Sequence, residues 1–132
     1  MRKFVYVLRR RPDLSREAFQ KYWREVHGPL VAKYADTIGL LRYIQAHTLD
    51  EAAPRKDEVR GQLADVYDGI AELWFDRDQA KGSEAERKAA NRILALDEKN
   101  FIDFEHSSMW LAKEFAFVGD VVPQAPANPD AA

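Results

Sequence analysis

The sequence predicts an α+β domain of the ferredoxin-like kind, with the element order βαββαβ and a four-stranded antiparallel sheet that carries both helices on one face. Two observations predict this fold. Four segments rich in β-branched and aromatic residues cover 4–8, 40–49, 67–75 and 107–118, and each is expected to form a strand. Segments 15–34 and 83–96 carry apolar residues at helical spacing and lie between these strands. A chain of 132 residues has the length of one such domain.

The first helix is expected to begin after Ser15, a residue type that caps helix N-termini well. Gly28-Pro29 interrupts the helical pattern, because proline has no backbone N–H group to donate to an interior helical bond. A kink or a restart is therefore predicted just after His27. The apolar side chains that share one helical face are Phe19, Tyr22, Trp23, Val26, Leu30 and Tyr34.

Side chains alternate along a strand, so Tyr43 and His47 share one face of the second strand, and Glu72 and Trp74 share one face of the third. The second helix carries a capping box, formed by Ser83 and Glu86. Along one side of this helix lie Ala85, Ala89, Ile93 and Leu96. The charged segment 50–65 contains Pro54 and predicts a long loop, with one helical turn near 58–63.

The face of the sheet that the helices leave uncovered is expected to bear Tyr6, Leu8, Glu72 and Trp74. Such a contiguous apolar patch is unfavourable in water. Pairing two sheets face to face would cover it, so the sequence predicts a two-fold homodimer.

Composition excludes several classes of protein. The net charge is -2, whereas nucleic-acid binders usually carry a clear basic excess, so no nucleic-acid partner is expected. The absence of cysteine excludes disulfides, thiolate metal sites and cysteine nucleophiles. No apolar stretch reaches the ~20 residues that span a bilayer, and the N-terminus lacks a signal-peptide core, so a cytoplasmic protein without membrane contact is predicted. The composition of 119–132, with three prolines and several alanines, predicts a flexible C-terminal tail.

Three segments resemble motifs of the EthD family, in the same order and spacing. The first is FQKYWREVHGPL at 19–30, the second is RYIQAH at 42–47, and the third is DGIAELWF at 68–75. The resemblance covers residues 1–118, which we expect to form one EthD-like domain followed by the 119–132 tail. It implies a dimeric α+β barrel. It also implies kinship with isomerases and with enzymes that decarboxylate, dehydrate or cyclise aromatic intermediates, most of which use neither a metal nor an organic cofactor.

Three side chains are candidate catalytic groups. His27 lies beside the apolar helix face where the backbone is interrupted, and imidazole titrates near neutrality, which suits proton transfer. His47 shares its strand face with Tyr43, which could donate a hydrogen bond. Glu72 alternates with apolar residues, and burial would raise the pKa of its carboxyl group. Each also has a purely structural interpretation: a histidine that caps a freed carbonyl, a histidine at a sheet end, and a carboxylate paired with an arginine.

Tyr6, Trp23, Tyr43 and Trp74 are the predicted substrate-binding residues, because aromatic rings can stack on a flat molecule; the alternative is that they belong to the core or the dimer interface. No metal site is predicted, since His27, His47 and His106 lack paired metal-ligand spacing. Haem remains an alternative, because other dimeric α+β barrels bind it and His27 or His106 could serve as its ligand.

Together these features predict a lyase or isomerase that needs no cofactor. Its substrate would be a small hydrophobic aromatic or lactone-like carbonyl compound, and its mechanism proton transfer by His27 with His47 or Glu72 as partner. Tyr43 would stabilise a developing oxyanion. The alternative is a non-catalytic protein that binds a small ligand, or an accessory protein of a catabolic or oxygenase pathway.

Overall fold

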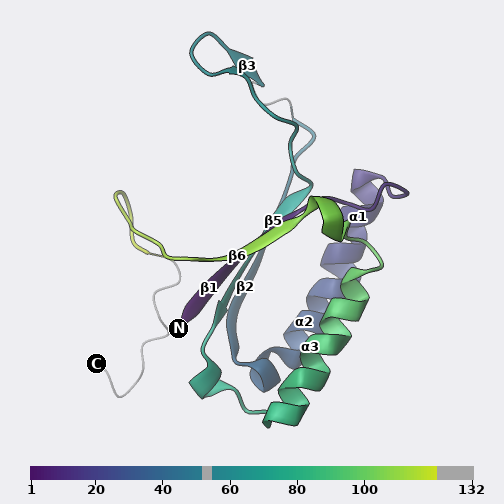
Figure 1. Cartoon of the computed structure of the whole chain (residues 1–132), viewed down its shortest axis with the longest axis vertical. Helices are drawn as coiled ribbons and strands as arrows, with labels where there is room; N and C mark the ends of the chain where they lie inside the picture. Colours follow the sequence, from purple (N-terminus) through teal and green to yellow (C-terminus); the bar gives the residue numbers. More distant parts are fainter. Residues whose placement is uncertain (52–54, 122–132) are drawn as a thin grey trace.

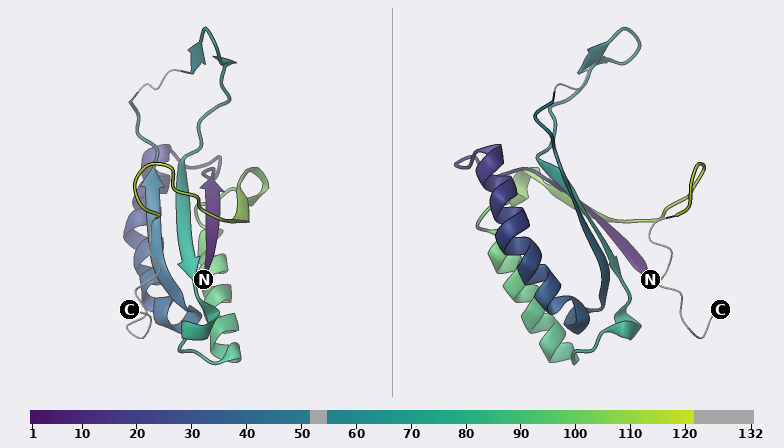
Figure 2. Two further views of the ribbon diagram at one scale, coloured as in Figure 1. Left: turned by 90° about the vertical axis from the view of Figure 1, so that its left-hand side faces the viewer. Right: turned by 180° about the vertical axis from the view of Figure 1, so that it is seen from behind.

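A computed structural model describes residues 1–51 and 55–121 of the chain. Its main sheet is antiparallel, with strand order β2-β5-β1-β6. These strands are β1 (Arg2–Leu8), β2 (Leu40–His47), β5 (Gly69–Phe75) and β6 (Ser108–Ala112). The helices cover one face of this sheet (Figures 1 and 2). The predicted α+β fold and four-stranded antiparallel sheet are confirmed.

The first helical segment is continuous but irregular. It consists of α1 (Arg16–Tyr22), one π-helical turn, η1 (Trp23–His27), and α2 (Gly28–Ile38). Ser15 caps it as predicted, its side chain accepting the backbone N–H of Ala18. Pro29 occupies the first turn of α2, where a missing N–H group is tolerated. The wider π turn thus replaces the predicted kink, and it ends at His27.

The second helix, α3 (Glu84–Glu98), carries the predicted capping box of Ser83 and Glu86. Its predicted inward side is wrong by one residue. Ala90 and Leu94 are buried against α2, whereas Ile93 is 40% exposed. The small Ala90 side chain permits close packing of α3 on α2. Alanines occur on both sides of α3, so the apolar pattern of the sequence did not distinguish the buried side from the exposed one.

Two buried clusters lie between the helices and the sheet. The first, at one end, comprises Leu8, Phe19, Trp23, Ala71, Phe101 and Ile102. The second comprises Val31, Ile38, Leu40, Ala90 and Leu94. Gly69 allows Trp23 to lie against the sheet, because a Cβ atom there would be 2.4 Å from the Trp23 ring.

The register of β1 and β5 corrects the prediction for the open face of the sheet. Tyr6 pairs with Ala71 and Val5 pairs with Glu72, so Tyr6 and Glu72 point to opposite faces. Tyr6 and Leu8 face the helices, and only Glu72 and Trp74 of the predicted set lie on the open face. The alternation of side chains along a strand shows which residues share a face of the sheet, but it does not show which of the two faces is turned toward the helices.

Two further segments differ from the prediction. The 58–63 region is not helical: β3 (Lys56–Asp57) and β4 (Gly61–Gln62) form a small hairpin that projects from the sheet (Figure 1). Its turn is fixed by the Asp57 carboxylate, which accepts the backbone N–H groups of Val59 and Arg60. Strand β6 ends at Ala112, and 113–121 contains no helix or strand. Pro54 and most of the predicted tail lie outside the described residues.

The remaining elements are the short helices η2 (Arg77–Gln79) and η3 (Phe104–His106). Within the described ranges, no helix is both long and apolar enough to cross a membrane.

Candidate functional site

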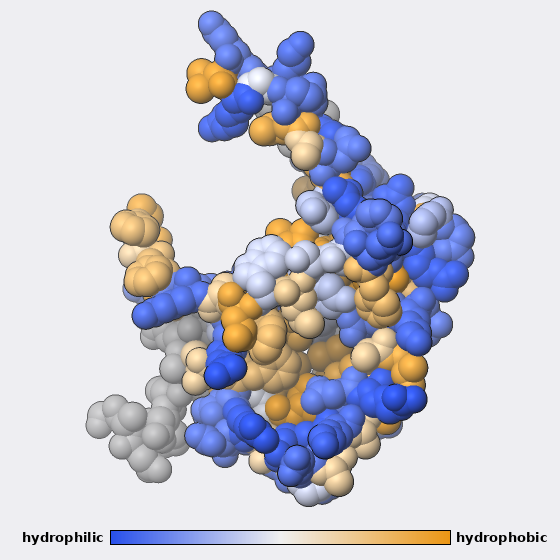
Figure 3. Space-filling view, viewed as in Figure 1, coloured by the Kyte–Doolittle hydropathy of each residue, from blue (hydrophilic) through white to orange (hydrophobic). Residues whose placement is uncertain are grey.

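A cavity of about 420 Å³ lies between the sheet and the helices. Figure 3 shows the molecule hollowed on this side, with hydrophobic residues inside the hollow and hydrophilic ones around it. The volume is within the range of small-molecule sites. Toward the ends of α2 and β5 the walls are apolar and include Val31, Ile38, Leu40, Phe75 and Leu94. The ionisable groups that line it are Tyr6, His27, Tyr43 and Glu98.

His27 reaches the cavity from the end of the π turn. Its Nδ1 atom lies 2.8 Å from the Asp97 carboxylate of α3, and its ring packs 4.9 Å from that of Phe101. Burial lowers the pKa of His27, although the Asp97 carboxylate acts in the opposite direction. The imidazole is therefore held neutral near pH 7, against the wall of an apolar cavity.

The Asp97 carboxylate is itself anchored. Its second oxygen accepts the Tyr22 hydroxyl at 2.6 Å and the Asn100 side-chain amide at 3.3 Å. Burial opposes its charge, but the hydrogen bonds from Tyr22 and His27 lower the pKa of Asp97. A charged carboxylate can only accept, so Nδ1 of His27 carries the proton and Nε2 is the basic atom of the ring.

Glu98 follows Asp97 but behaves differently. Burial, together with the charge of Asp97, raises the pKa of Glu98 to about 7, against a smaller effect of the neighbouring Tyr6 hydroxyl. Burial and the Glu98 charge raise the pKa of Tyr6, which therefore stays protonated. The cavity thus contains a neutral imidazole and a carboxyl group that is partly protonated at neutral pH.

A second polar group of side chains surrounds the Tyr43 hydroxyl. The Trp23 indole donates to this oxygen at 3.1 Å, and the Gln45 amide donates to it at 2.9 Å. The His47 Nε2 atom lies 2.8 Å from the Gln45 side-chain oxygen, and its ring stacks on Trp23 at 4.4 Å. Burial lowers the pKa of His47, and the charge of Arg24 adds to this effect. His47 does not line the cavity; it is connected to it through the stacked Trp23 ring and, by way of Gln45, through Tyr43.

The structure separates the other six predicted site residues into two sets. Tyr6, Trp23, His27 and Tyr43 line one cavity. Glu72 lies on the open face of the sheet, where its carboxylate is 3.0 Å from the Lys3 ammonium group rather than beside an arginine. Trp74 lies on that face too, under Lys3 and Arg42.

Sequence reasoning missed Asp97 and Glu98. They follow Ala90 and Leu94 at helical spacing, so a correct choice of the buried side of α3 would have directed them inward. Two adjacent acidic residues at the end of an amphipathic helix were the feature of the sequence that could have indicated them as site residues.

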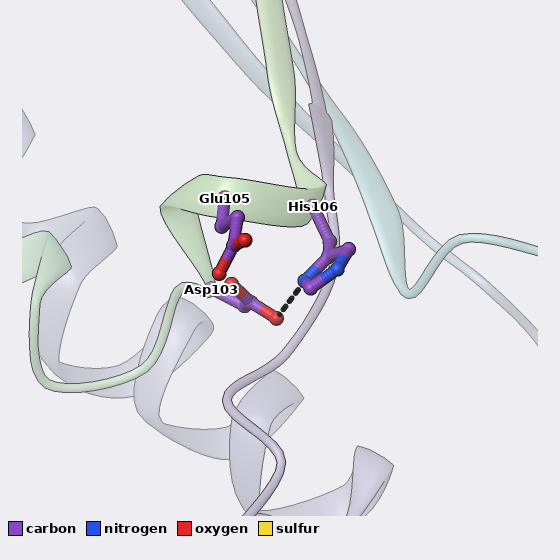
Figure 4. A group of neighbouring side chains, drawn as sticks. All are labelled: Asp103, Glu105 and His106. Carbon is purple, nitrogen blue, oxygen red and sulfur yellow. Dashed lines mark hydrogen bonds and ion pairs between the residues drawn. The ribbon is translucent and has the colours of Figure 1, made fainter.

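The part of the chain that the structure describes holds one group of potential metal ligands, Asp103, Glu105 and His106, whose ligand atoms lie within 4.8 Å of one another. The His106 imidazole pairs with Asp103 at 2.7 Å, as Figure 4 shows. This group is outside the cavity and contains neither His27 nor His47, so the three histidines considered from the sequence are not brought together. Exposed acidic groups of this kind are common without an ion, and we assign it no metal.

Comparison with known proteins agrees with this fold. A family model described as EthD domain matches residues 11–105. The chain resembles an EthD family protein from Bacillus halodurans C-125, with a TM-score of 0.50 and 18% identity over 87% of this chain and 100% of that one. It also resembles HapK from Hahella chejuensis (TM-score 0.49, 11% identity, 91% and 100% covered) and the hypothetical protein At3g17210 from Arabidopsis thaliana (TM-score 0.49, 18% identity, 89% and 90% covered). No protein of curated function matches.

Proposed function

This chain belongs to the EthD family, and from its cavity we propose that it is an isomerase or lyase that transfers protons on a small, mostly apolar carbonyl compound. The observation that carries the proposal is the His27–Asp97 pair, joined at 2.8 Å, whose imidazole lines the same apolar cavity as Glu98. A neutral base and a partly protonated acid in one mostly apolar cavity suit proton transfer near neutral pH.

His27 is the proposed general base. Its Nε2 atom would take a proton from the carbon next to the substrate carbonyl, and the electron pair of that C–H bond would move to the carbonyl oxygen. The Asp97 carboxylate holds the ring in the tautomer that leaves Nε2 unprotonated and would stabilise the imidazolium that forms. In this proposal, His27 and Asp97 together form the base that the removal of the proton requires.

Glu98 takes the place of His47 and Glu72 as the proposed partner of His27. Where the substrate carries a carbon–carbon double bond next to the carbon that loses its proton, the protonated carboxyl group would deliver a proton to the far end of the dienolate, which gives an isomer with the double bond shifted. Where the substrate carries a hydroxyl group two carbons from the carbonyl, the same proton would leave with that group as water, which gives a lyase. Tyr43 would donate a hydrogen bond to the enolate oxygen.

Proton exchange tests this function without knowledge of the natural substrate. We would incubate the protein in D2O with 2-tetralone, a small aromatic ketone, and follow the loss of its α-proton signals by NMR. The wild type should accelerate the exchange, and His27→Ala should slow it by roughly 10²- to 10⁴-fold. His106→Ala, which changes an exposed histidine outside the cavity, is the matched control. Equal rates for the wild type and His27→Ala would contradict the proposal.

The mostly apolar lining of the cavity also suits a binding protein without chemistry. That candidate predicts that 2-tetralone raises the melting temperature of the protein while the exchange rate stays at its value in buffer. The two measurements on one sample therefore separate the enzyme from the binding protein.

A further inference from the structure

We infer that Gln45 and His47 are positioning residues, which turn the hydroxyl hydrogen of Tyr43 into the cavity and so select ligands with a carbonyl or enolate oxygen at that point. The inference rests on the proposed function, because it names what the same cavity recognises. It is carried by a chain of directed hydrogen bonds between β2 and the π turn.

The orientation of the Gln45 amide is fixed by the backbone. Its nitrogen lies 2.9 Å from the carbonyl oxygen of Trp23, which can only accept a hydrogen bond. The atom beside that carbonyl must therefore be the NH2 group and not the amide oxygen. The same NH2 group is 2.9 Å from the Tyr43 oxygen, to which it consequently donates.

His47 supports this orientation from the other side. Its Nε2 atom faces the Gln45 oxygen at 2.8 Å, so Nε2 carries a hydrogen and donates it. Its Nδ1 atom is buried and has no partner among the described residues, which favours the neutral ring with an unprotonated Nδ1. Stacking on the Trp23 ring holds the imidazole in place.

The Tyr43 oxygen accepts hydrogen bonds from two donors, which limits where its own hydrogen can point. The Trp23 indole N–H and the Gln45 NH2 group are both donors, and together they use the two lone pairs of the Tyr43 oxygen. The hydroxyl hydrogen cannot point at either of them. Among the described residues the Tyr43 hydroxyl accepts these two hydrogen bonds and donates none, and the Tyr43 side chain lines the cavity wall. The direction left for this hydrogen is into the cavity, where a ligand oxygen would accept it.

The carbonyl stretching frequency of a bound ketone measures this hydrogen bond directly. We would bind 2-tetralone with a ¹³C-labelled carbonyl and record the band by isotope-edited infrared spectroscopy. In the wild type the band should lie below its frequency in hexane, because a hydrogen bond to the oxygen weakens the C=O bond. Tyr43→Phe should shift it to the apolar value and weaken binding roughly 3- to 10-fold.

Gln45→Glu is the decisive variant. It has nearly the same shape, but its carboxylate accepts where the amide donates, so it should draw the Tyr43 hydrogen away from the cavity. The band should then move to the Tyr43→Phe position although the Tyr43 hydroxyl is still present, and the double variant should show no further shift. Gln45→Met, which neither donates nor accepts strongly, should give an intermediate band, and it serves if Gln45→Glu fails to fold. The exposed Gln79→Met and Tyr67→Phe are controls that should leave the band unchanged.

His27→Ala distinguishes this inference from the proposed function. It should slow proton exchange to the extent given above but keep the low carbonyl frequency, because Tyr43 is untouched. A band that is identical in the wild type, Tyr43→Phe and Gln45→Glu, or no bound-state band at all, would overturn the role of Gln45 and His47. The exchange rate alone decides the role of His27.

Discussion

Asp97 and Glu98 are adjacent carboxylates whose pKa values move in opposite directions, and the cause is the set of donors that each one meets. Asp97 accepts hydrogen bonds from Tyr22, His27 and Asn100, which stabilise its charge. Glu98 faces an apolar cavity, with Tyr6 as its hydrogen-bonding neighbour. Although they are neighbours on α3, Asp97 is a structural anion and Glu98 is able to donate a proton at neutral pH.

Glu98→Gln should make stability less dependent on pH. The Glu98 carboxyl titrates near 4.5 when exposed and has a pKa of about 7 in the folded protein. Between these values the folded protein binds a proton that the unfolded chain has lost, so the free energy of unfolding falls as pH rises, by on the order of 3 kcal/mol. Urea unfolding at pH 4.5 and 7.5 should show a smaller fall for Glu98→Gln than for the wild type or the exposed control Glu58→Gln. Equal falls would contradict the burial of this carboxyl group.

Asp97→Asn should lower the pKa of His27 further. Burial already lowers it, and the Asp97 charge is the opposing influence that this change removes. NMR titration of the imidazole nitrogens should report the decrease, together with a larger fraction of the tautomer protonated at Nε2. Asp36→Asn, at an exposed aspartate on α2 that pairs with Lys81, should leave the His27 titration unchanged. A rise in the His27 pKa would show that Asp97 does not act through its charge.

The pH dependence of 2-tetralone exchange follows from the same two groups. Removal of the α-proton requires neutral His27, whose pKa is lowered from its ordinary 6.5. It also requires protonated Glu98, with a pKa of about 7, because a charged carboxylate in the same cavity would oppose the negative charge of the enolate. The rate should therefore be greatest between these two values and fall on both sides. In Glu98→Gln the decrease above pH 7 should disappear, and a rate that continues to rise through pH 8 in the wild type would remove Glu98 from the mechanism.

The site was partly predictable from single residues. The position of His27 followed from helical spacing and from the Gly28-Pro29 interruption, and Tyr43 and His47 share a strand face as alternation requires. Glu72 was misplaced relative to the cavity, because alternation fixes which residues lie together but not which group faces the helices. Its carboxylate on the open face meets the Lys3 ammonium group, a pairing set by the β1–β5 register.

At the scale of elements, capping residues predicted helix starts correctly, whereas the ends of strands and loops were predicted less well. Ser15 and Ser83 cap α1 and α3 as expected, because each cap depends only on hydrogen bonds to nearby residues in the chain. The 58–63 segment forms the turn of a hairpin instead of a helix. The Asp57 carboxylate accepts two backbone N–H groups of the turn, and Gly61 adopts the positive φ at which the chain reverses direction. Strand β6 is shorter than its apolar pattern, since only its first half pairs with β1.

Gly69→Ala should destabilise the contact between the π turn and β5. A Cβ atom there would meet the Trp23 ring at 2.4 Å and the Ala46 carbonyl at 2.8 Å, and both belong to rigid surroundings. We expect a loss of roughly 1–3 kcal/mol in urea unfolding, and a change in Trp23 fluorescence as the ring is displaced. Gly61→Ala, which meets no atom within 4 Å and strains only the backbone, should cost less. A smaller loss at Gly69 than at Gly61 would show that Trp23 has room to move.

At the scale of the whole molecule, the open face of the sheet is the feature that the helices leave unexplained. The β1–β5 and β2–β5 registers place Val5, Val7, Ile44 and Ile70 on it, around Glu72 and Trp74. The β1–β6 pairing adds Trp110, which is 47% exposed. This set differs from the one predicted from the sequence, because Tyr6 and Leu8 line the cavity instead. Its aliphatic and indole side chains share the face with Lys3 and Arg42, which lie over Trp74.

We therefore still expect a two-fold homodimer in which two open faces pack together, because contiguous apolar strands rarely stay in water. Sedimentation equilibrium at micromolar concentration should give about twice the chain mass of 15.2 kDa. Ile70→Lys should shift the protein toward the monomer, since it would bury an ammonium group within the proposed interface. Ile93→Lys is a closely matched control, because both isoleucines are 40% exposed but Ile93 lies on α3, outside the proposed interface. A wild-type mass of 15.2 kDa, or equal dissociation by both variants, would mean that this face is not where two copies meet.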